Sequence, residues 1–174
     1  MAGYVRAEGL DQLSRMLQKV GNNAGEIAAA GLYAGAGVVA DALTAAVDSI
    51  VTEEFKYAPP GQKRLPSPEE KAALKNRTGI AKFRGSSTEI DTMVGFKGAG
   101  YVTLGDKRKA VILIANSINS GTSCMLKQPV FRRAISKSRG AATDAIVETA
   151  DKVIHTLTVG NVSAADFAKY FPKR

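Results

Sequence analysis

The stretch LIANSINSGTSCMLKQPVFRRA, residues 113–134, decides the fold. Within it, Gly121 can adopt the positive φ that a sharp turn requires, and the Thr122 hydroxyl can hydrogen-bond to the backbone of that turn. Pro129 suits the first turn of a helix, because a helix leaves the backbone N–H groups there without partners. Phe131 can then enter the core. The stretch therefore predicts a tight turn followed by a helix that packs on the body of the protein.

The helix that opens at Pro129 is predicted to continue to Leu157. Apolar or small residues recur at steps of three and four, which is typical of a helix with one buried face. That face comprises Phe131, Ile135, Ser138, Ala142, Ile146, Thr149, Val153 and Leu157. In the C-terminal tail, residues 159–174, Ser163 with Asp166 three residues on predicts a short capped helix that carries aromatic residues.

Upstream of the turn, the sequence predicts strands. The apolar run 110–115 is too short for periodicity to separate strand from helix, and we predict a strand that passes into a helical turn. In residues 88–96, apolar and polar residues alternate with a period of two, as in a half-buried strand. Residues 101–104 are expected to pair back on that strand.

Two helices are predicted at the N-terminal end. The first covers residues 9–20, where apolar residues stand at helical spacing: Leu10, Leu13, Leu17 and Val20. Asn23, with an acid three residues on, predicts a capping box for a second helix from Ala24 to about Glu54. The first half of this helix is apolar nearly all round, which predicts burial on several sides. Gly31 and Gly35 indicate close packing against another helix.

Residues 56–85 differ from the rest in composition and are predicted to form an extended basic arm. They hold four of the six prolines, and Ser67-Pro68 predicts the start of a short helix that ends near Asn76. The alternative is a loop that only improves solubility. The arm supplies the candidate residues for an interface or a DNA channel: Lys63, Arg64, Lys71, Lys75, Arg77, Lys82 and Arg84.

Length and charge bound the class of protein. The 174 residues fit one domain, residues 1–158, followed by the tail, and a 45% hydrophobic content argues against wholesale disorder. The net charge of +8 is uneven, because residues 1–55 carry −4 while residues 56–84 and 85–139 carry +6 each. This asymmetry favours contact with a polyanion or an acidic protein. The longest nearly uncharged run, residues 27–40, is shorter than the roughly 20 residues that span a bilayer, so we expect no membrane partner.

The sequence predicts no enzyme. His155 is the sole histidine and has no cysteine or acid at ligand spacing, while Cys124, the single cysteine, has no histidine near it in sequence. No glycine pattern matches a phosphate-binding loop. We therefore expect no catalytic residue, no cofactor and no metal.

The stretch 113–134 resembles the C-terminal signature of the neck and tail-completion proteins of long-tailed bacteriophages, a family of minor tail components. In that family an N-x-G-T turn precedes Q-P-F-x-R-x-A at the start of the last helix. The phenylalanine here is displaced by one position. The matching residues are Asn119, Gly121, Thr122, Gln128, Pro129, Phe131, Arg132 or Arg133, and Ala134. The likeness is close over residues 110–136 and loose over residues 10–157, and the arm is longer and more basic than in compact members.

The resemblance implies an α+β subunit in which an antiparallel sheet of three or four strands packs against two long helices. It implies a structural virion protein of the phage neck, assembled in the host cytoplasm, that completes the tail and joins it to the head connector. Expected partners are copies of itself in a ring, sixfold or alternatively twelvefold, the neighbouring head-closure or connector and tail-tube or terminator proteins, and packaged DNA in the lumen.

Three alternatives remain. The chain could be a small DNA-binding protein without sequence preference, or a tail-terminator or head-closure subunit. The motif residues could also have a purely architectural role that marks no binding surface.

Overall fold

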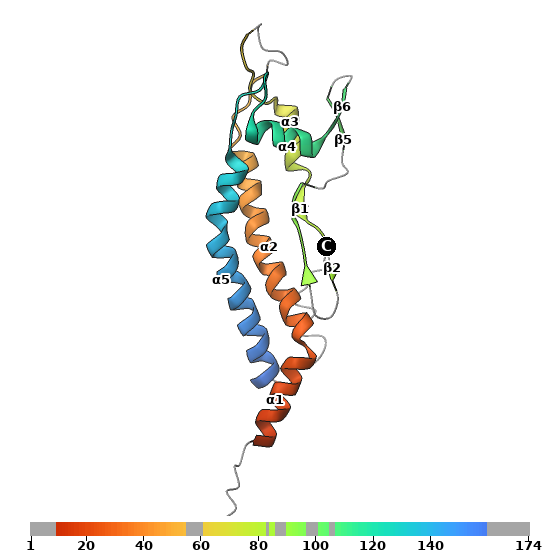
Figure 1. Cartoon of the computed structure of the whole chain (residues 1–174), viewed down its shortest axis with the longest axis vertical. Coiled ribbons are helices and arrows are strands. Elements are labelled where there is room, and N and C mark those ends of the chain that lie inside the picture. The colour runs from red at the N-terminus through yellow and green to blue at the C-terminus, as the bar shows by residue number, and fades with distance from the viewer. Residues whose placement is uncertain are drawn as a thin grey trace, which may run out of the picture.

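The computed structural model describes residues 10–54, 61–82, 84–85, 90–96, 101–104 and 107–159. Helices and short antiparallel strands share this part of the chain, which confirms a mixed helix and sheet class (Figure 1). In chain order the elements are α1 (Leu10–Asn22), α2 (Ala24–Asp48), α3 (Pro68–Lys75), β1 (Thr78–Ile80), β2 (Arg84–Gly85), β3 (Ile90–Asp91), β4 (Val94–Phe96), β5 (Tyr101–Leu104), β6 (Lys107–Ala110), α4 (Val111–Ser120) and α5 (Val130–Val159).

The long helices α2 and α5 run antiparallel, side by side (Figure 1). Gly35 allows this approach, because a Cβ atom there would lie 2.5 Å from Ile146 Cγ1 and 2.9 Å from the Ala142 carbonyl oxygen. A Cβ atom at Gly31 would lie 3.0 Å from the Ile146 carbonyl oxygen. The close helix packing predicted from these glycines is confirmed.

The junction between α1 and α2 differs from the prediction. Asn23 alone separates the two helices, and its side-chain amide donates to the Lys19 carbonyl oxygen at 2.8 Å instead of capping α2. The capping box expected with Glu26 is therefore wrong. The second helix also ends earlier than predicted, at Asp48, because the chain after it pairs with other segments.

Helix α2 is apolar, and its large apolar side chains are buried or half-buried. By length and composition alone it could cross a membrane, with a mean hydropathy of 1.5 over an 18-residue window, although the core helix of a soluble protein passes the same test. Only 33% of that window is buried. Among the described residues, α5 and the β1–β4 pair contact α2 without enclosing it.

Two hydrophobic clusters hold the described elements together. The larger joins the C-terminal half of α2 to α3, α4 and the start of α5, through Leu43, Val47, Ile50, Leu74, Val111, Ile114, Ile118, Met125 and Phe131. In this cluster Phe131 packs edge-on against Phe96, with ring centroids 5.1 Å apart. The smaller joins Ile27 and Ala30 of α2 to Val153 and Leu157 of α5.

The described strands form three separate antiparallel pairs, β1–β4, β2–β3 and β5–β6, and not one sheet of three or four strands. The predicted strand 88–96 is interrupted at Thr92 and Met93, where Ala81 N–H donates to the Met93 carbonyl oxygen and the Thr92 hydroxyl donates to the Ala81 carbonyl oxygen. Residues 101–104 pair with β6 and not with that strand.

The run 110–115 is mainly helical. β6 ends at Ala110, and α4 begins at Val111 and continues to Ser120. The buried residues Val111, Ile114 and Ile118 follow helical spacing, but this spacing becomes visible only when the window extends beyond residue 115. A six-residue window was therefore too short to reveal the helix.

Residues 61–82 fold against the body and do not extend from it as an arm. Leu74 is fully buried. The start of the short helix is confirmed: the Ser67 hydroxyl accepts from Glu70 N–H, and the Glu70 carboxylate accepts from Ser67 N–H, which together make a capping box. The helix predicted beyond Gly160 lies outside the described residues.

Candidate functional site

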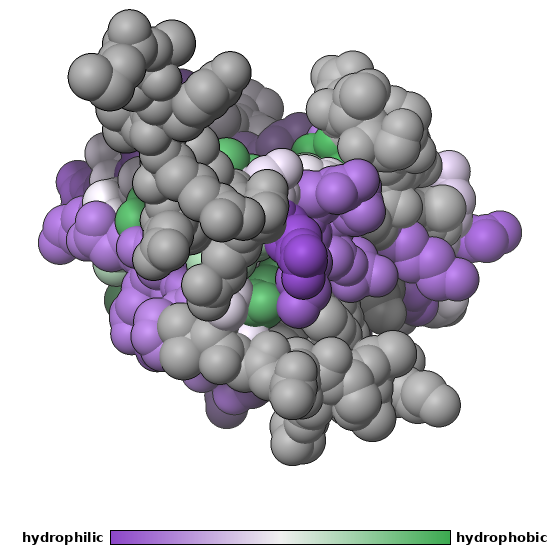
Figure 2. Space-filling view, turned by 90° about the horizontal axis from the view of Figure 1, so that it is seen from below, coloured by the Kyte–Doolittle hydropathy of each residue, from purple (hydrophilic) through white to green (hydrophobic). Residues whose placement is uncertain are grey.

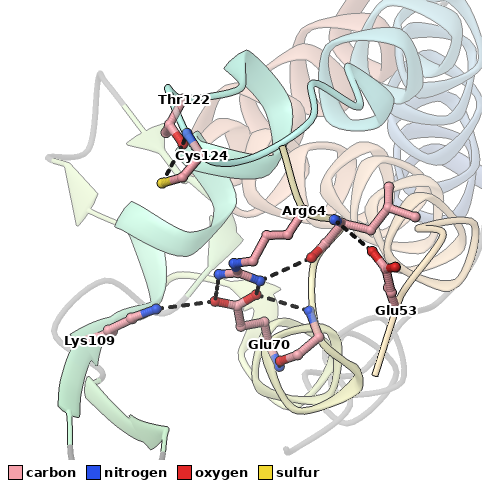
Figure 3. A network of polar contacts seen from close by, with 8 residues as sticks. Glu53, Arg64, Glu70, Lys109, Thr122 and Cys124 are labelled. Carbon is pink, nitrogen blue, oxygen red and sulfur yellow. Dashed lines mark hydrogen bonds and ion pairs between the residues drawn. The ribbon is translucent and has the colours of Figure 1, made fainter. Parts of the chain in front are cut away.

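A buried ion pair fixes the chain before α3. The Arg64 guanidinium donates to both carboxylate oxygens of Glu70, at 2.7 and 2.8 Å, and the two side chains are 13% and 4% exposed (Figure 3). Lys109 of β6 donates to the same carboxylate at 3.3 Å. One carboxylate thus ties together three segments of the chain.

The surroundings of Glu70 favour its charged form. Burial by itself would raise the pKa of this carboxyl group, but the hydrogen bonds from Arg64 and from Ser67 N–H, together with the Arg64 charge, lower the pKa below its usual value. The same pairing raises the pKa of Arg64. Both groups therefore stay charged near neutral pH. The ion pair persists under these conditions and holds the chain before α3 in place, so we interpret it as a structural anchor.

Residues 64–66 lie between two other segments. Glu53 N–H donates to the Pro66 carbonyl oxygen, and Leu65 N–H donates to the Glu53 carboxylate. On the other side, Arg64 N–H donates to the Cys124 carbonyl oxygen at 3.0 Å, and Leu126 N–H donates to the Arg64 carbonyl oxygen at 2.9 Å. The chain after α2, the chain before α3 and the turn after α4 are therefore joined through their backbones.

The turn predicted around Gly121 is present. Gly121 has φ 76°, and a Cβ atom there would lie 3.0 Å from Lys127 Cβ. The Asn119 side-chain oxygen accepts from Arg132 N–H at 3.4 Å, which links the end of α4 to the start of α5. Thus Asn119, Gly121 and Arg132 of the motif act on the same junction.

Gln128 connects this junction to the segment that follows α2. Val51 N–H donates to Gln128 Oε1 at 3.0 Å, and Gln128 Nε2 donates to the Val51 carbonyl oxygen at 2.9 Å. Its own backbone N–H donates to the Ile118 carbonyl oxygen at 2.8 Å. Sequence reasoning picked out Gln128 from the resemblance but gave no partner for it.

Thr122 and Cys124 form a small exposed contact. The Thr122 hydroxyl accepts from Cys124 N–H and lies 3.5 Å from Cys124 Sγ. This contact with Thr122 lowers the pKa of the Cys124 thiol. Within the described ranges, no group of three or more histidine, cysteine or acidic side chains could hold a metal ion.

The seven predicted arm residues do not form one free surface. Besides Arg64, Lys71 donates to the Asp48 and Ile50 carbonyl oxygens, at 2.8 and 2.9 Å, and Lys75 pairs with the Asp48 carboxylate at 2.8 Å. Both lysines belong to α3, and their ammonium groups contact the C-terminal end of α2, where the helix dipole favours a positive charge. Of the others, Lys63 and Lys82 are exposed, Arg77 is half-buried, and the Arg84 side chain lies outside the described part of the chain.

A free basic surface lies instead at the start of α5, where sequence reasoning did not place one. No acidic residue occurs between Val130 and Gly140. Four exposed basic side chains there have no ion-pair or hydrogen-bond partner among the described residues: Arg132, Arg133, Lys137 and Arg139. Because the helix dipole is also positive at this end, Arg132 and Arg133 in the first turn lower the stability of α5.

An open apolar groove of about 610 Å³ runs along α5. Apolar side chains from both long helices line it, chiefly Val39, Phe131, Ile135, Ala142 and Ile146. Ile135 is 48% exposed, so the prediction that it belongs to the buried face is wrong.

Comparison of the chain with protein-family models, with curated proteins and with solved structures found no match. The described geometry itself offers a rigid junction, a basic helix surface and an apolar groove.

Proposed function

We propose that this chain is a structural protein of the neck of a long-tailed bacteriophage. It completes the tail and joins it to the head connector, as a subunit of a ring around the DNA channel. The observation that carries the proposal is the use of the 119–132 motif as a junction between α4, α5 and the end of α2, through Asn119, Gly121 and Gln128.

Three features support this reading. The resemblance implies a sharp turn before the last helix, and in this chain a positive-φ turn precedes α5, the last described helix. Gln128 and the Arg64–Glu70 pair fix the neighbouring loops, so the junction is rigid, as a subunit under mechanical load between head and tail requires. The open apolar groove along α5, with Val39 of α2 in its lining, fits a protein whose neighbours cover it in the particle.

The proposed subunit acts through its interfaces. Its neighbours are further copies in a ring, with sixfold symmetry favoured over twelvefold, and the head-closure or tail-tube proteins on either side. Assembly takes place in the host cytoplasm and the product is the virion. A tail terminator or a head-closure protein would belong to the same class and differ only in the ring that it contacts.

A second candidate function is binding of double-stranded DNA without sequence preference. The unpaired basic side chains at the start of α5, Arg132, Arg133, Lys137 and Arg139, favour it. Such binding weakens steeply with salt, because each phosphate contact releases counterions. A gel-shift titration at two salt concentrations separates the candidates: binding by the isolated chain that weakens steeply at the higher salt concentration would favour the DNA-binding function.

The neck proposal is tested in the phage that encodes the chain. A null mutant should accumulate unjoined heads and tails, visible by electron microscopy, and the wild-type chain supplied from a plasmid should restore joined particles. Antibody labelling should place the chain at the neck of restored particles. Normal yields of joined, infectious particles from the null mutant would overturn the proposal.

A further inference from the structure

Helix α1 carries an apolar stripe that the described part of the chain covers only at its inner end. Val20 packs against the smaller cluster of α2 and α5 residues. Farther out, Leu13 is 51% exposed and Leu17 is 64% exposed. Figure 1 shows α1 extending past the end of α5, and Figure 2, which looks onto this end, shows small hydrophobic areas among hydrophilic residues. An amphipathic helix of this kind needs a partner for its apolar face.

The α2–α5 groove is a second unpartnered apolar surface, near the other end of the same helix pair. It follows α5 from Phe131 to Ile146, roughly 22 Å at 1.5 Å per residue. Helix α1 has 13 residues, which correspond to about 20 Å. The groove and the stripe therefore match in length and in apolar character.

One chain cannot bring these two surfaces together. Only Asn23 separates α1 from α2, and the inner end of α1 is held beside Val153 and Leu157. Ile135 lies roughly 33 Å along α5 from Leu157 at 1.5 Å per residue. A second copy of the chain, in contrast, supplies an α1 stripe that can reach the groove.

We propose that α1 of one copy docks, through Leu13 and Leu17, into the α2–α5 groove of the next copy at Ile135. This interface rests on the proposed ring and identifies the surfaces that build it. Because two different surfaces meet, the contact is head-to-tail, the type of contact that builds a closed ring when the rotation between successive copies closes. The basic residues Arg15 and Lys19 lie on the opposite side of α1 from Leu13 and Leu17 at 100° per residue, so they point away from Arg132 and Arg139.

Directed disulfide formation tests the docking. A chain with Leu17→Cys and Ile135→Cys, in a Cys124→Ser background that removes the exposed natural thiol, should give a ladder of cross-linked species on a non-reducing gel. The ladder should end at the copy number of the ring. Mixing chains with only Leu17→Cys and chains with only Ile135→Cys should give dimers and nothing larger. Ser14→Cys, on the side wall of α1, is the matched control and should cross-link to Ile135→Cys far less.

Assembly itself provides a second measurement. Leu17→Asp and Ile135→Asp should each weaken self-association by about tenfold or more, as expected for loss of one buried leucine or isoleucine. Met93→Asp, at an equally exposed apolar position away from both surfaces (61% exposed), should leave self-association unchanged. Sedimentation velocity over a range of concentrations measures the difference, and the same variants are then assayed for joined particles.

The possible outcomes separate the two proposals. A ring that forms without the Leu17–Ile135 cross-link would overturn the docking and leave the neck function standing. Cross-linking of Leu17→Cys to its own copy in a neighbouring chain would assign α1 to a symmetric dimer and overturn the docking. A cysteine introduced at Phe171 of the C-terminal tail, residues 159–174, tests another occupant of the stripe. A link within one chain from Leu17→Cys to Phe171→Cys would assign the stripe to the tail and overturn the docking. A chain that assembles neither alone nor in particles would overturn the proposed function as well.

Discussion

Gln128 and Val51 are joined like two paired strand residues, although only one of them uses its backbone. Val51 N–H donates to Gln128 Oε1 at 3.0 Å, and Gln128 Nε2 donates back to the Val51 carbonyl oxygen at 2.9 Å, across a separation of 77 residues. The side-chain amide of glutamine has the donor and the acceptor that this contact requires. It connects the segment after α2 to the start of α5.

Replacing Gln128 should therefore loosen the junction. Gln128→Ala removes both hydrogen bonds and should lower the free energy of unfolding by about 1–3 kcal/mol, at roughly 0.5–1.5 kcal/mol per bond. Gln128→Glu should not restore it, because a carboxylate cannot donate to the Val51 carbonyl oxygen. Urea denaturation measures both, with the exposed Gln62→Ala as the control that should change little. Equal stability of Gln128→Ala and wild type would remove the junction role.

The buried ion pair gives a larger expected effect. Glu70→Ala leaves the Arg64 guanidinium, 13% exposed, without its carboxylate, and should cost about 3–5 kcal/mol. The exposed neighbour Glu69 on the same helix is the matched control, and Glu69→Ala should change stability by less than about 0.5 kcal/mol. Thermal and urea unfolding of the two variants would give the comparison.

The same carboxylate predicts the direction of a pH dependence. The folded-state pKa of Glu70 is lowered, so its contribution is fully present above the unfolded pKa of about 4.3 and is lost as pH falls through the folded pKa. Stability of the wild type should thus decline more steeply below about pH 4.3 than that of Glu70→Gln. Parallel curves for the two proteins over this range would contradict the assignment.

Replacing Gly35 and Gly37 of α2 with alanine should change the free energy of unfolding in opposite directions. Gly35→Ala places a Cβ atom 2.9 Å from the Ala142 carbonyl oxygen, which forces the helices apart and should cost about 1–3 kcal/mol. A Cβ atom at Gly37 meets nothing within 4 Å, so Gly37→Ala should stabilise α2 by up to about 1 kcal/mol through helix propensity. Denaturant midpoints of the two variants decide the sign.

Local patterns in the sequence predicted local structure well. The Gly121 turn, the Ser67 cap and the start of α5 after Pro129 each depend on residues within a few positions of one another, and each is confirmed. The close approach at Gly31 and Gly35 was also predictable, because residues four positions apart share one face of a helix. Two glycines there leave that face without side chains, so a second helix can come close.

Contacts between distant segments could not be predicted. Nothing near Arg64 in the sequence indicates that Arg64 and Lys109 converge on the Glu70 carboxylate, so a structural anchor was interpreted as part of a free arm. Ile135 has the spacing of a buried residue, but burial also depends on which elements lie opposite, and Ile135 lies half-exposed in the open groove. The predicted pairing of residues 101–104 with the strand 88–96 was wrong for the same reason. Alternation of apolar and polar residues indicates a strand but does not identify the strand with which it pairs.

The last prediction concerns the basic residues at the start of α5 and the effect of their charge on stability. Arg132 and Arg133 lie in the first turn of α5, where the helix dipole is positive and no acidic side chain of the described residues pairs with them. The double variant Arg132→Gln/Arg133→Gln should therefore raise the free energy of unfolding by about 0.6–2 kcal/mol at low salt, with a smaller gain at high salt. Lys63→Gln/Lys82→Gln removes the same charge from exposed positions outside helices and should stay within about 0.5 kcal/mol of wild type.

If these arginines are retained for contact with DNA, the stabilised α5 variant should lose function while the control keeps it. Its gel-shift affinity should depend less on salt, with the slope of log K against log salt concentration reduced by up to about 0.9 for each phosphate that the variant no longer neutralises. The count of joined particles in complementation should fall with it. A variant that is more stable, shows an unchanged salt slope and yields normal numbers of joined particles would show that the basic start of α5 serves neither DNA nor assembly.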